Sequence, residues 1–355
     1  MVTRKKVSVV ILAWNGRLFL EKFLPSVIKY SASETIEVVV ADNASTDDSV
    51  AFVQENYPQV RLIKNTVNEG FASGYNKVLK QIDAEYFILL NQDVEVTEGW
   101  IEKVLKSMEE EKDVVAAQPK IRAYHEKDSF EYAGACGGYL DRFGYAFCRG
   151  RIFDSIEKDL EQYNTITEIF WATGACLFVK SKTYFKLGGL DDDFFAHQEE
   201  IDLCWRIRNT GGKVICVPSS VVYHVGGGSL PQGNPRKTYL NFRNSLMMMF
   251  KNLPLSEMLW KVFIVRLSMD GIAAIHSVWK LKSLSDLMAI LKAHFAFYIS
   301  IPALVAKRRA VQNKSSDGLW QRSIVWQYYA LRKRKFSDLS NGIHNEFLKN
   351  TDCKI

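Results

Sequence analysis

The front of the chain alternates short apolar runs with segments whose apolar residues recur at helical spacing. The apolar runs are rich in β-branched residues and have the length of strands buried on both faces. They occupy residues 7–13, 37–41, 60–64 and 86–90. The segments of helical spacing occupy residues 18–30, 47–57 and 74–82. This alternation predicts an α/β fold with a mainly parallel, doubly wound sheet.

The pattern changes in the second half of the chain. Two further β-like runs, at residues 175–179 and 214–217, lie on either side of a polar helix. Residues 130–170 are rich in glycine and aromatic side chains and show no clear period. After a proline-containing loop the composition shifts to long apolar and basic helices. We therefore expect an α/β domain over residues 1–235 and a helical region over residues 236–355.

Asp93 follows the apolar run at residues 86–90, in the sequence Asn91-Gln92-Asp93. In parallel α/β sheets, ligands bind outside the carboxyl ends of the strands, which is where this side chain should lie. A divalent cation such as Mg²⁺ or Mn²⁺ takes oxygen ligands, typically one or two carboxylates together with diphosphate oxygens. Asp93 is therefore a candidate metal ligand, and the alternative is a carboxylate that caps a turn.

Asp42 follows the run at residues 37–41. A carboxylate at a strand end can accept a hydrogen bond from the N3–H of a uracil or thymine ring. For this residue taken alone, a helix N-cap is the favoured alternative.

Residues 68–76 (NEGFASGYN) combine small side chains with the start of a helix. Small residues let the backbone approach a ligand closely, and a helix N-terminus favours anions. The spacing matches neither a P-loop nor a GxGxxG fingerprint. An ordinary glycine-containing loop is the alternative.

An acidic cluster precedes an amphipathic helix at residues 197–206 (HQEEIDLCWR). Glu199, Glu200 and Asp202 place three carboxylates in four positions, more than a helix start alone requires. Crowded carboxylates raise one another's pKa, which suits a general base that works near neutral pH.

His224 ends the apolar stretch VVYH at residues 221–224 and precedes a triple glycine at residues 226–228. A neutral imidazole there can complete a metal shell or contact a diphosphate. A structural histidine is the alternative, and for a lone histidine it is the more common one.

The chain has 355 residues, 47% of them hydrophobic, and a net charge of +6 that is unevenly distributed. From residue 236 onward there are 20 Lys and Arg against 7 Asp and Glu. The six cysteines form no CxxC pair and no secretory signal opens the chain, so we expect a reduced cytoplasmic setting. Most of the cysteines then serve as small core residues.

The basic second part contains a strongly apolar stretch at residues 257–305. Charged residues and a proline interrupt it, so it is not a clear membrane span. Basic clusters beside amphipathic helices favour an anionic membrane surface as partner. A soluble helical subdomain or a homodimer interface is the alternative. No nucleic-acid-binding motif supports a nucleic acid as partner.

Taken in order, these segments resemble family-2 glycosyltransferases, which have the GT-A fold. The resemblance runs from residue 7 to about residue 229 and is nearest to bacterial rhamnosyltransferases and polysaccharide-assembly enzymes. Its motifs in this chain are VSVVILAWN, VVVADNAS, NEGFASGYN, FILLNQDVEV, TGACLFVKS, HQEEIDLCWR and VYHVGGGS.

The resemblance implies roles for particular residues. The nucleotide-sugar donor would be bound by Ala13, Asn15, Asp42, Asn68, Gly74, Asn76, Asn91 and Gln92. Trp171, Thr173 and Gly174 would border the sugar and the acceptor. Asp93 would be the last acid of a DxD motif that binds Mg²⁺ or Mn²⁺ with help from His224. Glu200 would be the catalytic base, with Glu199 as its competitor.

Two positions depart from the usual family pattern. Asn91 replaces the first acid of DxD, so metal binding relies on fewer charges. Glu200 stands where an aspartate is usual and is one methylene longer.

The function implied by the resemblance is an inverting transfer of a sugar from a nucleoside-diphosphate sugar, such as dTDP-rhamnose or a UDP-sugar. The acceptor would be a hydroxyl of a lipid-linked saccharide at the inner face of the cell membrane. Two alternatives are a nucleotidyltransferase on a related α/β fold and a non-catalytic sugar-binding protein. The first needs a basic, glycine-rich loop after the first strand, where only Arg17 is basic.

Overall fold

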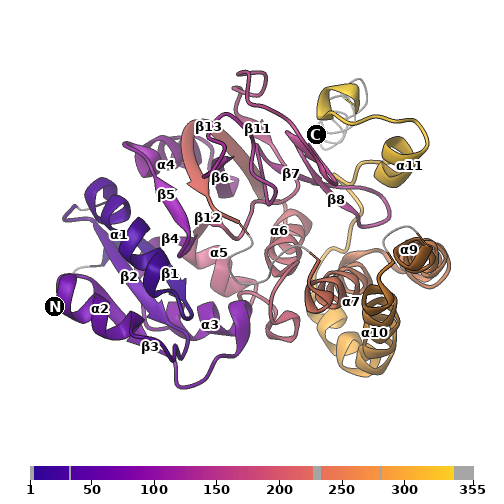
Figure 1. Ribbon diagram of the computed structural model, residues 1–355, viewed down its shortest axis with the longest axis horizontal. Coiled ribbons are helices and arrows are strands. Elements are labelled where there is room, and N and C mark those ends of the chain that lie inside the picture. The colour runs from indigo at the N-terminus through magenta and orange to yellow at the C-terminus, as the bar shows by residue number, and fades with distance from the viewer. Residues whose placement is uncertain (1–3, 32, 227–232, 280–281, 340–355) are drawn as a thin grey trace.

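The computed structural model describes residues 4–31, 33–226, 233–279 and 282–339. A mixed sheet of nine strands forms the centre of the protein, with helices on both of its faces (Figure 1). Its strands are β1 (Lys5–Ala13), β2 (Ile36–Asp42), β3 (Arg61–Lys64), β4 (Ala84–Asn91), β5 (Val94–Val96), β6 (Val114–Ala123), β11 (Thr167–Glu168), β12 (Cys176–Lys180) and β13 (Lys213–His224).

The strands lie in the order β11-β13-β6-β12-β4-β1-β2-β3, with β5 paired to β13. The β1, β2, β3 and β4 strands are parallel to their neighbours among the four, and β13 is parallel to β6. The β12 strand runs antiparallel between β4 and β6. The expected fold class, a mixed and mainly parallel α/β sheet, is confirmed.

The six predicted strands and the three predicted front helices are all present, with shifts of a few residues at their ends. The sequence pattern did not indicate β6. Its apolar run is interrupted by Gln118, Pro119 and Lys120, yet Gln118 and Lys120 are buried in the structure. A strand with buried polar side chains cannot be predicted from its hydrophobic pattern alone.

Two layers of helices cover the sheet. The layer on one face consists of α1 (Arg17–Ser31), α2 (Ser49–Asn56) and α4 (Trp100–Glu110). The layer on the other face consists of α3 (Gly70–Leu79), α5 (Ser181–Lys186) and α6 (Glu199–Asn209). In β1, Val9 packs into the first core and Val10 into the second, as the two-residue period of a strand requires.

Residues 130–170, which show no clear hydrophobic period, contain a second, four-stranded antiparallel sheet. Its strands are β7 (Gly138–Leu140), β8 (Ala146–Cys148), β9 (Arg151–Ile152) and β10 (Ser155–Ile156). Strands of two or three residues are too short to show a period. Aromatic packing joins this sheet to the end of the chain: the ring centroids of Phe147 and Trp320 lie 5.3 Å apart, and those of Tyr139 and Phe336 5.1 Å apart.

The second part of the chain is helical, as expected. Its elements are α7 (Pro235–Asn252), α8 (Leu255–Trp260), the π-helical segment η2 (Lys261–Arg266), α9 (Leu267–Trp279), α10 (Leu284–Ala310), α11 (Ile324–Tyr329) and the short 3-10 helix η3 (Phe336–Leu339). Leu246, Phe297 and Trp320 from this part belong to the same core as α3 and α6. The division at residue 235 stays a prediction, because the two parts share a core.

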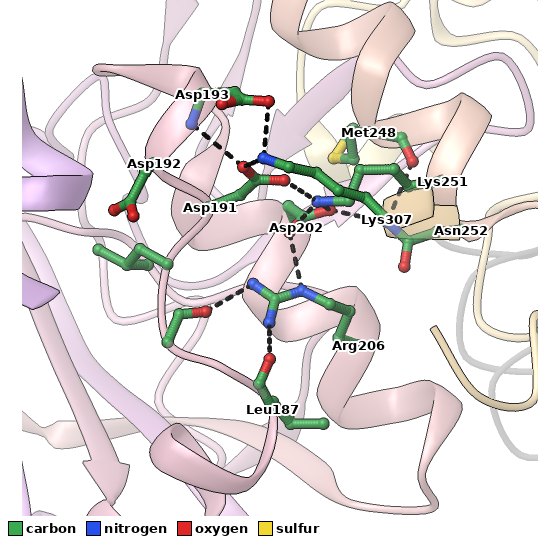
Figure 2. Close-up of polar contacts among 12 residues, drawn as sticks. Leu187, Asp191, Asp192, Asp193, Asp202, Arg206, Met248, Lys251, Asn252 and Lys307 are labelled. Atoms are coloured by element: carbon green, nitrogen blue, oxygen red, sulfur yellow. Dashed lines mark hydrogen bonds and ion pairs between the residues drawn. The ribbon is translucent and has the colours of Figure 1, made fainter. Parts of the chain in front are cut away.

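A network of buried charges joins α7 and α10 to α6 and to the 3-10 helix η1 (Asp192–Phe194), as Figure 2 shows. The ammonium group of Lys251 contacts Asp191 and lies 3.0 Å from Asp202. Lys307 contacts Asp191 and lies 2.6 Å from Asp193. Charges removed from water are stabilised when they are paired, so this network fixes how the helical part sits on the sheet domain.

Among the described residues, α10 is the helix that is long and apolar enough to cross a membrane. The five described cysteines are unpaired and buried, as small core residues would be. Cys353, the residues 227 and 228 of the triple glycine, and Pro231 lie outside the described residues.

Candidate active site

A cavity of about 1150 Å³ lies where β1, β4 and β13 end and where α6 and α7 begin. Nine of the predicted site residues line it: Asn68, Asn91, Gln92, Asp93, Thr173, Gly174, Glu199, Glu200 and His224. The strand ends therefore converge as the sheet topology led us to expect.

Asp93 and His224 meet on one wall of this cavity. The Nε2 atom of His224 lies 3.1 Å from Oδ1 of Asp93 and 3.3 Å from Nδ2 of Asn91, and its Nδ1 lies 3.4 Å from Oε1 of Glu131. Burial by itself would lower the pKa of His224, but the carboxylates of Glu131 and Asp93 outweigh it and raise the pKa to about 10. Burial raises the pKa of Asp93, but the charge of His224 and its hydrogen bond prevail and lower it, so Asp93 is ionised.

Two buried carboxyl groups, Glu199 and Glu200, face the same cavity from the first turn of α6. Burial raises the pKa of Glu200 to about 7, although backbone hydrogen bonds around it act in the opposite direction. Burial and the neighbouring Glu200 raise the pKa of Glu199 further above its usual range. The Oε2 atoms of Glu199 and Glu200 have no hydrogen-bond partner among the described residues. The two carboxyl groups therefore both hold protons more tightly than ordinary glutamates do, and the pair can exchange a proton near neutral pH.

The loop before Glu199 has an unusual backbone. Phe195, His197 and Gln198 have φ values of 63°, 70° and 74°, in a region that side chains with a Cβ rarely occupy. Three such residues within four positions cost free energy that the surroundings must offset. Burial lowers the pKa of His197 to about 4, and Lys237 contributes in the same direction, so its imidazole is neutral.

Asn244 of α7 holds this loop in place. Its Nδ2 atom donates to the carbonyl oxygens of Phe194 at 2.9 Å, Ala196 at 2.9 Å and His197 at 2.7 Å. The Phe195 carbonyl accepts from the backbone N–H of Phe71 at 2.6 Å. The loop that leads to the acid pair is thus fixed from both sides.

The predicted residues at the ends of β1 and β2 do not line the cavity. Ala13 is buried, and the Oδ1 of Asn15 accepts from the backbone N–H of Thr46 at 2.7 Å. The carboxylate of Asp42 accepts from the backbone N–H of Ser45, at 3.2 Å to the nearer oxygen. These side chains stabilise the loop, and the adjacent residues Trp14 and Asn43 line the cavity instead.

Asn68 and Gln92 line the cavity and also brace its wall. The Oδ1 of Asn68 accepts from Nδ2 of Asn43 at 3.0 Å, and Oε1 of Gln92 accepts from the backbone N–H of Trp14 at 3.1 Å. Gly74 is packed against Asn43, where a Cβ would lie 3.2 Å from the amide. It therefore shapes the wall from behind and does not face the cavity.

Asn76 and Trp171 lie away from the cavity. The Nδ2 of Asn76 donates to the Leu190 carbonyl at 2.7 Å and its Oδ1 accepts from the hydroxyl of Tyr184 at 2.6 Å. The indole N–H of Trp171 donates to the Tyr139 carbonyl at 3.0 Å in the core. Both side chains secure the fold around the site.

Several cavity residues were not predicted from the sequence. They include Glu131, Tyr132, His197, Arg236 and Lys237. Glu131 and Tyr132 lie in the stretch that showed no pattern. Arg236 and Lys237 had a detectable signal, since a basic pair directly follows a proline at a predicted helix start.

Comparison with known proteins identifies the domain. The family model described as glycosyl transferase family 2 matches residues 8–171. An N-acetylglucosaminyl-diphospho-decaprenol L-rhamnosyltransferase of Mycobacterium tuberculosis is 26% identical over 236 residues, which cover 61% of this chain and 75% of that protein. An O-antigen biosynthesis protein, RfbC of Myxococcus xanthus, is 24% identical over 62% of this chain and 17% of its own length.

Solved structures show the same fold. GalNAc-T7 with UDP, GalNAc and Mn²⁺ superposes with a TM-score of 0.57 at 15% identity, over 85% of this chain and 58% of that one. TarS 1-349 of S. aureus in complex with UDP-GlcNAc gives a TM-score of 0.55 at 13% identity, over 86% of this chain and 88% of that one. Residues 8–171 therefore match the glycosyl transferase family 2 model, and the chain has the GT-A fold.

Proposed function

We propose that the protein is an inverting glycosyltransferase that moves a sugar from a nucleoside-diphosphate sugar to a hydroxyl of a lipid-linked saccharide. The observation that carries the proposal is the shared cavity of Asp93, His224 and the Glu199–Glu200 pair. A transfer of this kind needs a group that stabilises the charge of the leaving diphosphate and a base that takes a proton from the acceptor. The cavity holds candidates for both.

Glu200 is proposed as the base. A carboxyl group with a pKa of about 7 is ionised in part of the molecules at neutral pH and is a stronger base than an ordinary glutamate. It takes the proton from the acceptor hydroxyl as that oxygen attacks the anomeric carbon from the face opposite the diphosphate. This displacement inverts the anomeric centre and forms no covalent link to the enzyme. Glu199, the other carboxyl group of the pair, is the alternative base.

Asp93 and His224 are proposed as the protein ligands of a divalent cation, Mg²⁺ or Mn²⁺. The ionised carboxylate and the ring nitrogen 3.1 Å away would fit one cation once His224 releases the proton that its raised pKa holds in the metal-free protein, with the remaining ligands left to diphosphate oxygens. Among the described residues, no group of three or more His, Cys, Asp and Glu side chains is placed to hold a metal ion. This agrees with a cation that arrives together with the donor. Such a cation neutralises charge on the leaving diphosphate.

The substrates that we propose are based on the names of similar proteins. The similar mycobacterial protein is named for rhamnosyl transfer to a diphospho-decaprenol-linked sugar, and similar folds have been solved with UDP, UDP-GlcNAc and GDP-Man. We propose dTDP-rhamnose or a UDP-sugar as donor. A lipid-linked acceptor would bring the enzyme to the inner face of the cell membrane as a peripheral protein.

A donor screen tests the proposal. The full-length protein is incubated with thymidine- and uridine-diphosphate sugars, with and without Mn²⁺, and binding and slow hydrolysis are followed. We expect one donor to bind in a cation-dependent manner and its transferred sugar to have the inverted anomeric configuration by NMR. Retention of configuration would refute the mechanism. Pyrophosphate release from a nucleoside triphosphate and a sugar phosphate would favour nucleotidyl transfer instead.

A matched pair of variants separates catalysis from binding. Glu200→Gln should lose transfer while it still binds the donor, and Glu55→Gln, at an exposed position on α2, should keep both. Full activity of Glu200→Gln would leave Glu199 as the base or point to a non-catalytic sugar-binding role.

A further inference from the structure

The α9 and α10 helices lie side by side at one end of the protein and expose apolar side chains (Figure 1). Ile272, Ile275 and Trp279 follow one another at helical spacing on α9, as do Leu291, Phe295 and Ile299 on α10. We call these six residues the outer face. Trp279 is 89% exposed and Phe295 69%. Exposed apolar side chains gathered in this way mark a surface that contacts a partner or a membrane.

Three of the polar residues that interrupt the apolar sequence, Arg266, Asp270 and His294, are buried. Arg266 and Asp270 form an ion pair at 3.2 Å, and Nε2 of His294 lies 3.0 Å from the Asp270 carboxylate. Arg266 also donates to the Phe143 carbonyl at 2.9 Å, and the Tyr145 hydroxyl donates to Asp270 at the same distance. These polar groups hold the helices on the sheet domain and leave the outer face apolar.

The exposed charges around the outer face have one sign. Among the described residues of the segment 255–310, the exposed charged side chains are Lys282, Lys292 and Arg309. The acidic side chains of this segment are held in ion pairs or hydrogen bonds within the protein, namely those of Glu257, Asp270 and Asp286. An apolar surface rimmed by basic residues complements a lipid bilayer with anionic headgroups.

The α10 helix is long enough to cross a membrane, but its contacts hold it along the protein surface. Near its start, Asp286 accepts from the Thr238 hydroxyl at 2.8 Å. In its middle, His294 contacts Asp270, and near its end Lys307 lies 2.6 Å from Asp193. A helix tied to a folded domain along its length cannot also be surrounded by lipid on all sides.

From these observations we propose that the outer face docks on an anionic lipid bilayer, with α9 and α10 lying in the plane of the interface and not crossing it. Trp279 and Phe295 would enter the boundary between headgroups and acyl chains, and Lys282, Lys292 and Arg309 would contact the headgroups. A symmetric dimer through the same face would bring two sets of like charges together, which disfavours a second copy as the occupant. The role of this docking, delivery of the active site to a lipid-linked acceptor, rests on the proposed function.

Sedimentation of the full-length protein with vesicles tests the proposal. We expect binding to vesicles that contain phosphatidylglycerol and weaker binding to pure phosphatidylcholine. The double variant Ile275→Ser/Phe295→Ser should reduce partitioning to anionic vesicles by about tenfold or more, because both side chains lose their apolar area. The control Leu18→Ser/Leu160→Ser removes two side chains that are 77% and 78% exposed elsewhere, and it should bind as wild type does.

Three further measurements distinguish docking of the outer face on a lipid bilayer from dimerisation and from insertion across the membrane. Lys282→Glu/Lys292→Glu should lose the preference for anionic lipid, and light scattering should find the free protein monomeric. Equal binding of wild type and the outer-face variant would overturn the proposal, as would a dimer that this variant dissociates. Retention in membranes after alkaline extraction would overturn the in-plane arrangement. Donor hydrolysis in solution needs no membrane, so a wrong docking face and a wrong enzymatic function give different results.

Discussion

Replacement of Glu200 by glutamine should stabilise the protein at neutral and alkaline pH while it abolishes transfer. The pKa of Glu200 is raised from 4.5 to about 7 because the folded protein removes its carboxyl group from water. The folded state therefore holds this proton more tightly than the unfolded state does. Stability falls as the pH rises from about 4.5 through 7, since the unfolded chain releases the proton first.

The size of the effect follows from the two pKa values. At about 1.4 kcal/mol for each pH unit between them, ionised Glu200 costs the folded state about 3 kcal/mol above pH 7. Glutamine is close to the same shape and carries no charge, so Glu200→Gln should recover most of this free energy. In a chain of this size the gain corresponds to a rise in Tm of roughly 5 °C.

Thermal unfolding of the metal-free and donor-free protein at about pH 5 and about pH 8 measures the difference. Glu200→Gln should exceed wild type in Tm at the higher pH and nearly match it at the lower. Glu55→Gln, which removes an exposed carboxylate from α2, controls for net charge and should change Tm little at either pH. An equal shift of Tm at both values, or a loss of stability at the higher one, would refute the reasoning.

Four other variants, one of them a control, test the site and its supports. Asn244→Ala removes two N–H donors, which three loop carbonyls share and which are worth about 1 kcal/mol each, and should lower kcat more than it changes KM for the donor; an unchanged kcat would show that the loop needs no such support. Asp93→Asn should weaken Mn²⁺-dependent donor binding in calorimetry about tenfold to hundredfold, whereas equal affinity would exclude Asp93 from the cation site. Lys251→Met removes a buried cation from Asp191, which keeps Lys307, and from Asp202, which keeps Arg206, and should cost about 3 kcal/mol in urea unfolding, the lower end for a broken buried ion pair. Lys77→Met breaks an exposed pair with Glu69 and should cost less than about 1 kcal/mol, so similar losses for the two lysine variants would contradict this account.

The sequence predicted the sheet well where burial is uniform. The β1 and β4 strands are apolar on both faces and stand out from their surroundings. The β6 strand and the small sheet at residues 138–156 did not, because the first carries buried polar residues and the second has strands of two or three residues. The hydrophobic pattern of neighbouring residues does not reveal a strand that is stabilised by contacts with distant parts of the chain. The β8 strand, which packs against Trp320, is an example.

For the site, topology predicted more than residue type did. Asp93, His224 and Glu200 meet because strand and helix ends converge, and that convergence follows from the order of the elements. Asn76 has the same chemical character as Asn68, yet it lies in the core against Tyr184. Whether such an asparagine faces the cavity or the core depends on the orientation of α3, which is set by tertiary packing.

The path of α7 through the molecule bears on attempts to recombine this protein with its relatives. Its first residues, Arg236 and Lys237, line the cavity, its middle residue Asn244 supports the loop before Glu199, and its end is tied to α6 through Lys251. A chimera joined at residue 235 would thus exchange part of the active-site wall along with the docking helices. The chimera would take acceptor preference, the geometry of the loop before Glu199 and membrane attachment together from the same parent. A junction that changes only one of these properties has to lie after Asn252.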